Sequence, residues 1–336
     1  MALYTDIFGR LDWLTTRVKR LCCSVDQVKE QAATAAATQA ANNPCYIEII
    51  WNDIANASYR NLASYVAGST YDIGGTPFTG FVETGNIQRL YGGSNIILSA
   101  GLLGNPTNIV SINDPCGTFT TVDYTTFQSN AVLSYINLTG VTLILDYAFN
   151  NCSALSYINF PNVITISTGA FKGCQSLLSI DFPKASYAGI EAFGNGNAIS
   201  FINMPNLTYA DNSCFLNVDN YSGIINFPKL TYAGDRCFDM YSCAGFNLPL
   251  VQTIGSRCFE NCLYASFYNL NSCTNLGGTT GFDAVWGNVI NRTAISLVIT
   301  LTIPVALMTC DSGNPDGDIV YLIDPAQNNT VTIITV

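Results

Sequence analysis

A phrase of about 22 residues recurs through the middle of the chain, and it constrains the fold more than any other feature. Its clearest part is a short apolar run followed in most copies by proline, as in YINFP, SIDFP and FINMP. A fixed period in the low twenties is typical of a solenoid, in which each coil contacts only its neighbours. The last apolar residues of the runs are Leu138, Phe160, Phe182, Met204, Phe227, Leu248 and Leu270.

A second column keeps the same period. It consists of Phe149, Phe171, Phe193, Phe215, Phe238 and Phe259, and Phe127 lies one period earlier. We therefore expect about eight coils, the first of them beginning near Ile109. The residue before each phenylalanine is small, which predicts a tight apolar slot where cysteine acts as a small hydrophobe. These residues are Ala148, Ala170, Ala192, Cys214, Cys237 and Cys258.

Strand alternation predicts which side chains face outward. Ile158 and Phe160 should enter the core, while Tyr157 and Asn159 should face the opposite side. Repeating this assignment along the array gives a candidate ligand face: Tyr135, Asn137, Tyr157, Asn159, Asp181, Phe201, Asn203, Asn226, Asn247, Phe267 and Asn269, with Ser179, Ile224 and Gly245 at the remaining ring positions. Amides beside aromatic rings suit recognition of a saccharide or a protein. Alternatively, the amides are architectural and hydrogen-bond along the array.

The repeat resembles the BspA-like leucine-rich repeat over residues 109–275. The resemblance is carried by the strand pattern L-x-x-I-x-F and by the preceding phrase in YAFNNCSALSYINFP. The cysteine that follows this phrase is kept at Cys152, Cys174 and Cys262 and replaced in the other coils. The resemblance implies a leucine-rich-repeat solenoid, a module familiar in bacterial surface adhesins.

The first 41 residues carry a heptad-like seam, which predicts a coiled-coil stalk or attachment helix. Its apolar positions are separated by alternating steps of three and four: Tyr4, Ile7, Leu11, Leu14, Val18, Leu21, Val25 and Val28. A narrow seam predicts self-association as a dimer or a trimer. The alternative is one amphipathic helix lying on the chain's own body.

The repeat is flanked by two segments in which β structure is expected. Residues 42–108 contain short apolar runs separated by glycine-rich turns, which predicts a small β-rich domain. Residues 276–336 lose the period but contain runs such as TVTIITV, which predict a β capping region. The expected fold is therefore mainly β: a leucine-rich-repeat solenoid with an N-terminal oligomeric coiled coil and β-rich flanking domains.

The composition argues against an enzyme, a cofactor and a nucleic-acid partner. The chain has no histidine and a formal net charge of −10. Without histidine the chain lacks the side chain that most often acts as a general base or a zinc ligand. The negative net charge disfavours a surface that binds phosphate groups. Asp311, Asp316 and Asp318 have a spacing that suggests a calcium loop, although a polar turn between strands is the simpler interpretation. No apolar run reaches the length of a membrane span, so no membrane insertion is expected.

The thirteen cysteines are expected to be reduced thiols. The N-terminal residues lack the pattern of a secretory signal, so we expect a chain that folds where disulfides are rare. Adjacent coils could bring Cys214, Cys237 and Cys258 near one another, but the sequence predicts that these three cysteines stay unbridged.

As a whole, the chain resembles structural proteins of crAss-like phages, such as a head fibre or a tail-associated protein. The resemblance rests on the stalk together with the tail SGNPDGDIVYLI. It implies a homo-oligomeric virion component assembled in the host bacterial cytoplasm. Such a component would contact other virion proteins through its N-terminal region, and its repeats could touch a host-surface glycan or protein. The alternative is a bacterial BspA-like adhesin or repeat scaffold.

Overall fold

The computed structural model describes residues 46–52, 76–84, 86–103, 106–276, 298–303 and 330–335. All of them belong to one compact unit, Tyr46–Val336, which is distinct from Met1–Cys45. Within the described ranges the chain is mainly β, with one helical turn, α3 (Ala100–Leu103), and one 3₁₀ turn at Pro106–Asn108. The whole predicted seam from Tyr4 to Val28 lies outside them, as does the acidic loop around Asp316, so the coiled coil stays a prediction.

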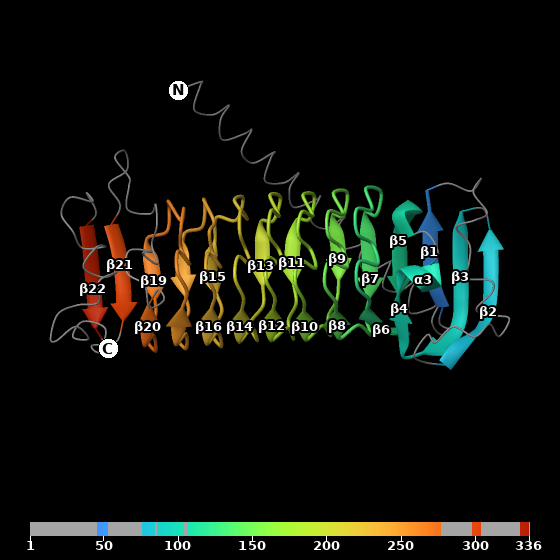
Figure 1. Cartoon of the computed structure of the whole chain (residues 1–336), viewed down its shortest axis with the longest axis horizontal. Helices are drawn as coiled ribbons and strands as arrows, with labels where there is room; N and C mark the ends of the chain where they lie inside the picture. The colour runs from blue at the N-terminus through green and yellow to red at the C-terminus, as the bar shows by residue number, and fades with distance from the viewer. Residues whose placement is uncertain are drawn as a thin grey trace, which may run out of the picture. The chain divides into compact units, whose positions relative to one another are not determined.

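Each coil contributes one strand to each of two rows (Figure 1). We call the first row the odd-strand face. It contains β5 (Ile109–Asp114), β7 (Tyr135–Leu138), β9 (Tyr157–Asn159), β11 (Ser179–Asp181), β13 (Phe201–Asn203), β15 (Ile224–Asn226), β17 (Gly245–Asn247), β19 (Phe267–Asn269), β21 (Val298–Ile303) and β22 (Thr330–Thr335).

The second row is the even-strand face, whose strands are mostly two residues long. It contains β4 (Ile96–Leu98), β6 (Phe119–Val122), β8 (Leu143–Ile144), β10 (Thr165–Ile166), β12 (Tyr187–Ala188), β14 (Tyr209–Ala210), β16 (Tyr232–Ala233), β18 (Thr253–Ile254) and β20 (Asn275–Leu276). These nine strands form one continuous parallel sheet. The predicted period is confirmed, because the strands pair in register one coil apart, as Thr165 does with Tyr187.

The odd-strand face differs because it is divided into three sheets. The first ends at β9, the second contains β11 and β13 alone, and the third begins at β15. The break after β13 coincides with the one step of 23 residues, where the extra residue lets the Tyr221 hydroxyl bond to the Ile224 carbonyl at 2.8 Å. The break after β9 falls beside Asp181.

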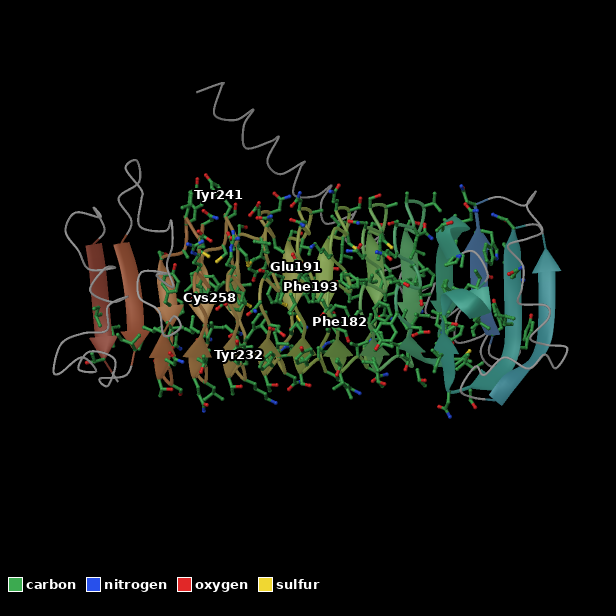
Figure 2. All side chains as sticks on the ribbon, in the orientation of Figure 1. Phe182, Glu191, Phe193, Tyr232, Tyr241 and Cys258 are labelled. Carbon is green, nitrogen blue, oxygen red and sulfur yellow. The ribbon has the colours of Figure 1, made fainter. Side chains whose placement is uncertain are left out.

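The core between the two rows is a spine of phenylalanine rings. Phe127, Phe149, Phe171, Phe193, Phe215, Phe238 and Phe259 stack in sequence, with ring centroids 5.0–6.1 Å apart and planes within 16°. Figure 2 shows Phe193 and Phe182 between the strand rows. Tilted contacts such as Phe182–Phe193 join this spine to the strand-end column. Both predicted apolar columns are therefore buried, as each coil needs its neighbour to cover its rings.

The turns between the rows use left-handed backbone at two positions of the coil. One column contains Thr125, Tyr147, Gly169, Glu191, Ser213, Arg236 and Arg257, and the other contains Ser129, Asn151, Gly173, Asn195, Asn217 and Asn261. Asparagine and glycine tolerate this conformation, whereas the larger residues of the first column are held there by the surrounding coils. At Gly169 a Cβ atom would also lie 2.5 Å from the Tyr147 ring, so a larger residue would need this ring to move.

The N-terminal flank extends the odd-strand face. Strands β1 (Tyr46–Trp51), β2 (Thr76–Thr84) and β3 (Ile87–Ser94) form an antiparallel set in which β1 also pairs with β5. In addition, β4 pairs with β6, so the even-strand sheet begins ahead of Ile109. These antiparallel strands cover the first open edge of the repeat, as a terminal cap must.

At the other end the strand row continues after the 22-residue period is lost. β21 pairs in parallel with β19, and β22 pairs in parallel with β21. The longer connections before β21 and β22 lie largely outside the described residues. Both strands nevertheless run parallel to the strands of the repeats. The expectation that TVTIITV forms a paired strand is confirmed.

The cysteines divide into two groups. Eight are free and buried: Cys152, Cys174, Cys214, Cys237, Cys243, Cys258, Cys262 and Cys273. The prediction of reduced thiols is wrong for Cys116, which is disulfide-bonded to a partner outside the described residues. Sequence spacing alone gave no sign of this bond.

The cysteine three residues after the column phenylalanine donates a hydrogen bond inside the core. The Cys152 thiol donates to the Phe127 carbonyl of the preceding coil at 3.0 Å, Cys174 does the same to Phe149 at 3.1 Å, and Cys262 to Phe238 at 2.8 Å. Burial raises the pKa of Cys152 to about 12. These sulfurs are therefore core hydrogen-bond donors in the thiol form, not nucleophiles.

Candidate recognition surface

The outward asparagines of the odd-strand face form a hydrogen-bonded ladder. In each link an Nδ2 group donates to the Oδ1 atom of the preceding coil, as Asn159 does to Asn137 at 2.7 Å. The other links are Asn137 to Asn113, Asn203 to Asp181, Asn247 to Asn226 and Asn269 to Asn247, at 2.7–2.8 Å. The hydrogen bonding that an architectural column predicts is therefore present in five links. Amides engaged in the ladder have less hydrogen-bonding capacity left for a ligand.

The ladder is interrupted at the same two places as the strand pairing. No ladder bond joins Asn159 to Asp181, or Asn203 to Asn226, among the described residues. The first interruption has a chemical cause, because an ionised carboxylate accepts hydrogen bonds but cannot donate one to Asn159. The second follows from the extra residue before β15. The segment β11–β13 thus stands between two discontinuities.

Large apolar side chains are exposed around this segment. The exposed fractions are 47% for Tyr157, 56% for Leu178, 52% for Phe201 and 47% for Ile224, and we call these four residues the apolar patch. One face of Tyr157 stacks on Tyr135, with centroids 4.8 Å apart and planes within 4°. The short Ser179 side chain lies in the next coil, between the ring positions of Tyr157 and Phe201.

The candidate face does not continue uniformly to the last coils. Gly245 is buried, and a Cβ atom there would lie 2.5 Å from the Phe267 carbonyl oxygen. Phe267 itself is partly buried. The assignment of Gly245 to an exposed column is therefore wrong, because adjacent backbone closes over it. The exposed part of the candidate face is concentrated between β7 and β15.

Leu178 was not identified from the sequence, although a signal existed. In neighbouring coils its position is serine, namely Ser134, Ser156 and Ser200, and each hydroxyl donates to the preceding coil's backbone carbonyl. Leucine cannot make this bond and is instead exposed. An apolar residue that replaces a structural serine could have been found by aligning the coils.

The even-strand face carries a second aromatic array that the sequence analysis missed. Tyr187, Tyr209 and Tyr232 stack at centroid distances of 5.4 and 4.4 Å, and the Tyr187 hydroxyl donates to Asp211 at 3.2 Å. Burial, aided by the Asp211 charge, raises the pKa of Tyr187 to about 12, and burial beside Tyr209 does the same for Tyr232. The recurring phrases SYAG, TYAD and TYAG were the signal. Because the rings cover each other's faces, a ligand would meet mainly their edges.

The family is shown by a match over more than half of the chain. A model described as "BspA type Leucine rich repeat region", in six copies, matches residues 81–195 and 142–266. The chain belongs to the BspA-type leucine-rich repeat family. The expected repeat class is thus confirmed, and the BspA-type match begins within the N-terminal flank, before residue 109.

Several solved leucine-rich-repeat structures are similar to this BspA-type chain. One is the leucine-rich repeat protein of T. pallidum, at 19% identity over 55% of this chain and 73% of that one, with a TM-score of 0.36. Another is a leucine-rich cell surface protein from Faecalibacterium prausnitzii, at 15% identity over 76% and 86%, with a TM-score of 0.43. A third, from Bacteroides ovatus, has 14% identity over 68% and 95%, with a TM-score of 0.23. The search of curated proteins gave no match.

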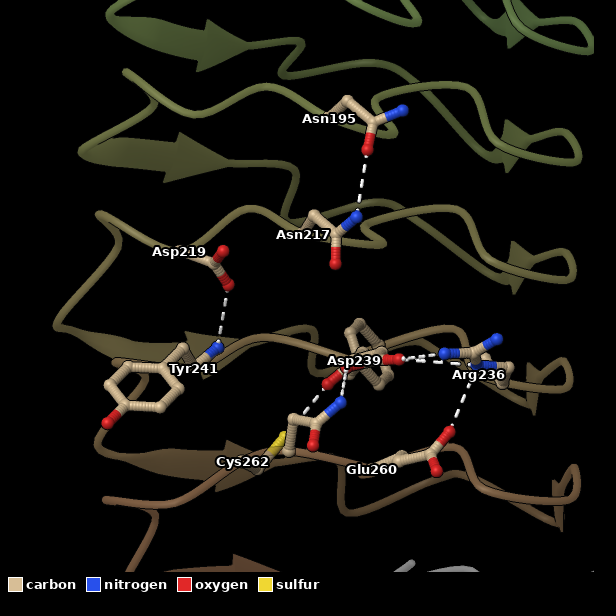
Figure 3. Close-up of polar contacts among 10 residues, drawn as sticks. Asn195, Asn217, Asp219, Arg236, Asp239, Tyr241, Glu260 and Cys262 are labelled. Carbon is tan, nitrogen blue, oxygen red and sulfur yellow. Dashed lines mark hydrogen bonds and ion pairs between the residues drawn. The ribbon is translucent and has the colours of Figure 1, made fainter. Parts of the chain in front are cut away.

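The last coils of the BspA-type repeat contain a charged network at the turns (Figure 3). Buried Asp239 accepts from Arg236 Nη2 at 2.8 Å through one oxygen and from Asn261 Nδ2 at 2.8 Å through the other. Arg236 Nε also lies 3.0 Å from Glu260. The hydrogen bond to Asp239 raises the pKa of Arg236. The network joins successive coils, and both oxygens of Asp239 are engaged in it.

Potential metal ligands are not clustered in the described part of the chain, where no group of three gathers. Burial raises the pKa of Asp114, but this carboxylate accepts the Phe119 N–H at 2.8 Å and so holds a turn. Among the same residues, no helix is long and apolar enough to cross a membrane. The described chemistry is that of a structural array whose odd-strand face exposes the apolar patch.

Proposed function

We propose that this BspA-type chain is a recognition module without catalytic activity, which binds a partner through the odd-strand face. The observation that carries the proposal is the apolar patch of Tyr157, Leu178, Phe201 and Ile224. Exposing four large apolar side chains on adjacent coils costs solubility unless a partner covers them. The two strand rows and the phenylalanine spine hold the patch in a fixed arrangement, which lowers the entropy lost on binding.

The experiment compares partner capture by wild-type chain and by Phe201→Glu, with Tyr264→Ala as a matched control. Tyr264 is also exposed, at 45%, but lies outside the patch. Each purified full chain is cross-linked to surface extracts of the source cells, and the captured proteins or glycans are identified by mass spectrometry. A partner retained by wild type and by Tyr264→Ala but lost by Phe201→Glu supports the proposal. Equal capture by all three chains contradicts it.

We further propose that the module is presented on an oligomeric stalk, either as a head-fibre or tail-associated protein of a phage virion or as a bacterial surface adhesin. The N-terminal seam, including Leu14 and Leu21, supports the stalk. The virion alternative places other virion proteins at the N-terminal region and a host-surface glycan or protein at the repeats. The Cys116 disulfide favours an oxidising destination, which both alternatives allow after release or export.

Light scattering of the full chain after size-exclusion chromatography tests the stalk. The wild-type chain should be a dimer or trimer, and Leu14→Glu with Leu21→Glu should give a monomer, because charges cannot be buried in the seam. Circular dichroism checks that the repeats remain folded. A monomeric wild type would remove both the stalk and the virion fibre. Particle imaging would then separate virion from cell-surface attachment.

A further inference from the structure

We propose that the partner is a protein segment in which apolar side chains surround a lysine or arginine, and that this cation pairs with Asp181. The inference rests on the proposed recognition function and adds the chemistry of the partner. It follows from the position of one carboxylate beside the apolar patch and from the interruption of the ladder there.

The apolar patch has the composition of a protein-binding surface. It combines two aromatic residues with two aliphatic ones, Leu178 and Ile224, and lies on the coils of β9, β11, β13 and β15. At a strand spacing of about 4.8 Å these four coils extend over about 14 Å, the length of a short peptide segment. Exposed apolar residues rimmed by polar groups are typical of the centre of a protein interface.

Asp181 gives this patch one unbalanced charge. It is exposed, and its Oδ1 atom accepts from Asn203 Nδ2 at 2.8 Å. No lysine or arginine occupies an outward position on β5 to β19, and no ion pair of Asp181 occurs among the described residues. A carboxylate next to apolar side chains binds a cation more strongly once a partner excludes water.

The ladder indicates that Asp181 is retained at a cost to stability. Asparagine at this position could donate to Asn159 and connect the first two ladder segments. A residue that breaks a local structural rule without a structural gain is a candidate for function. The carboxylate supplies what asparagine cannot, a full negative charge where strands β5 to β19 present no other charged side chain outward.

Other occupants fit less well. A second copy would present the same face, which has no outward cation, and would bring a further net charge of −10. Nucleic acid would be repelled by that charge. A saccharide would need several free donors and acceptors, but the Nδ2 groups of Asn137, Asn159 and Asn203 already donate within the ladder.

The test is selection from a random peptide display library on immobilised full chain, with a glycan array probed in parallel. Wild type should enrich peptides that carry lysine or arginine between apolar residues. Their affinity should fall about tenfold or more for Asp181→Asn and for Leu178→Ser, because each removes a central contact. Leu178→Ser restores the residue found at this position in neighbouring coils. Binding should also weaken as salt increases.

The matched control is Leu250→Ser, since Leu250 is 49% exposed and lies outside the patch. Its affinity should stay within about twofold of wild type, as expected for a residue outside the interface. Urea unfolding of each variant confirms that the fold is retained. Peptides without a cation, or equal binding to Asp181→Asn, would overturn the inference. So would a glycan bound by wild type and lost in Phe201→Ala.

These outcomes are separable from those of the recognition test. If Phe201→Glu abolishes partner capture while Asp181→Asn leaves peptide binding unchanged, the face binds a partner but the partner chemistry is wrong. If capture is equal for all chains in the first experiment, the recognition function itself fails.

Discussion

At the scale of the residue, one atom can decide whether neighbouring coils are joined. Asp181 has a carboxylate oxygen where an asparagine would have an NH₂ group that could donate to Asn159. The ladder therefore stops between these two residues. Elsewhere a buried thiol donates to a carbonyl of the preceding coil, as Cys174 does to Phe149. In a repeat these choices recur, so a departure from the column stands out against its neighbours.

Asp181→Asn should stabilise the chain. The new amide can donate to Asn159 Oδ1 while keeping the bond from Asn203, and one added hydrogen bond is worth about 1 kcal/mol. The urea midpoint should therefore rise. Asn247→Asp is the reverse control, since it removes the Nδ2 donor to Asn226 and should lower the midpoint. An unchanged or lower midpoint for Asp181→Asn would contradict the ladder argument.

Phe193→Ala should destabilise the chain by about 3–5 kcal/mol, because it opens a cavity in the aromatic spine. Phe193 is fully buried and stacks between Phe171 and Phe215 at 5.7 and 5.4 Å. Phe193→Leu keeps most of the volume and should cost less than about 1.5 kcal/mol. The free energies of unfolding from urea titrations measure both changes. Equal costs for the two variants would argue against a packed spine.

At the scale of the element, the two faces of the coil show different regularity. The even-strand face is one sheet of nine short strands, while the odd-strand face is three sheets. The even strands stay in register across steps of 21 to 23 residues, and the tyrosine stack adds side-chain contact between β12, β14 and β16. The odd-strand face tolerates the extra residue before β15 and the carboxylate at Asp181, and it is there that apolar side chains are exposed.

Stability should fall as the pH rises from about 10 to about 12. The folded pKa values of Tyr187 and Tyr232 are raised to about 12 from an ordinary value of 10.0. Below this window the phenols are protonated in both states. Within it the unfolded chain releases protons that the folded chain keeps, so unfolding becomes easier.

Phenolate absorbance measures this effect. The wild-type chain should show a late-ionising component near pH 12 that is lost in the Tyr187→Phe, Tyr232→Phe double variant. The double variant should also lose less stability across the window. If both chains gave the same titration curve, the burial of these hydroxyls would be wrong.

At the scale of the whole molecule, the described cysteines combine a disulfide at Cys116 with a set of thiols that are protected by burial. Cys116 is disulfide-bonded, whereas the eight free cysteines of the described residues are buried. Burial raises the pKa of thiols such as Cys174 and Cys214, which keeps them protonated and unreactive. The folded chain can therefore enter an oxidising environment without mispairing its core cysteines.

A thiol count tests this pattern. In denaturant without reductant the chain should show at most eleven thiols of its thirteen cysteines, and thirteen after reduction. In the native state the eight buried thiols should not react with an aromatic disulfide reagent. Cys116→Ser should remove the difference made by reductant. Thirteen thiols before reduction would show that Cys116 is not bonded.

The repeat can be predicted from the sequence alone. Period, phenylalanine columns, strand alternation and the BspA-type class all follow from local pattern, because each coil contacts only its neighbours and must repeat their chemistry. The two-residue alternation of a strand predicts that Ile158 is buried and that Tyr157 is exposed, as the structure shows.

Tertiary structure decided what depends on contact between coils or between distant segments. The amide ladder and its interruptions, the division of the odd-strand face, the burial of Gly245 and the Cys116 disulfide all require atoms to meet across 21 or more residues. A periodic pattern shows where a residue or a step departs from the average coil, as at Asp181 and before β15, but it does not show how the departure alters strand pairing. The apolar patch lies at such a departure, so the sequence indicated the face and the structure located the site on it.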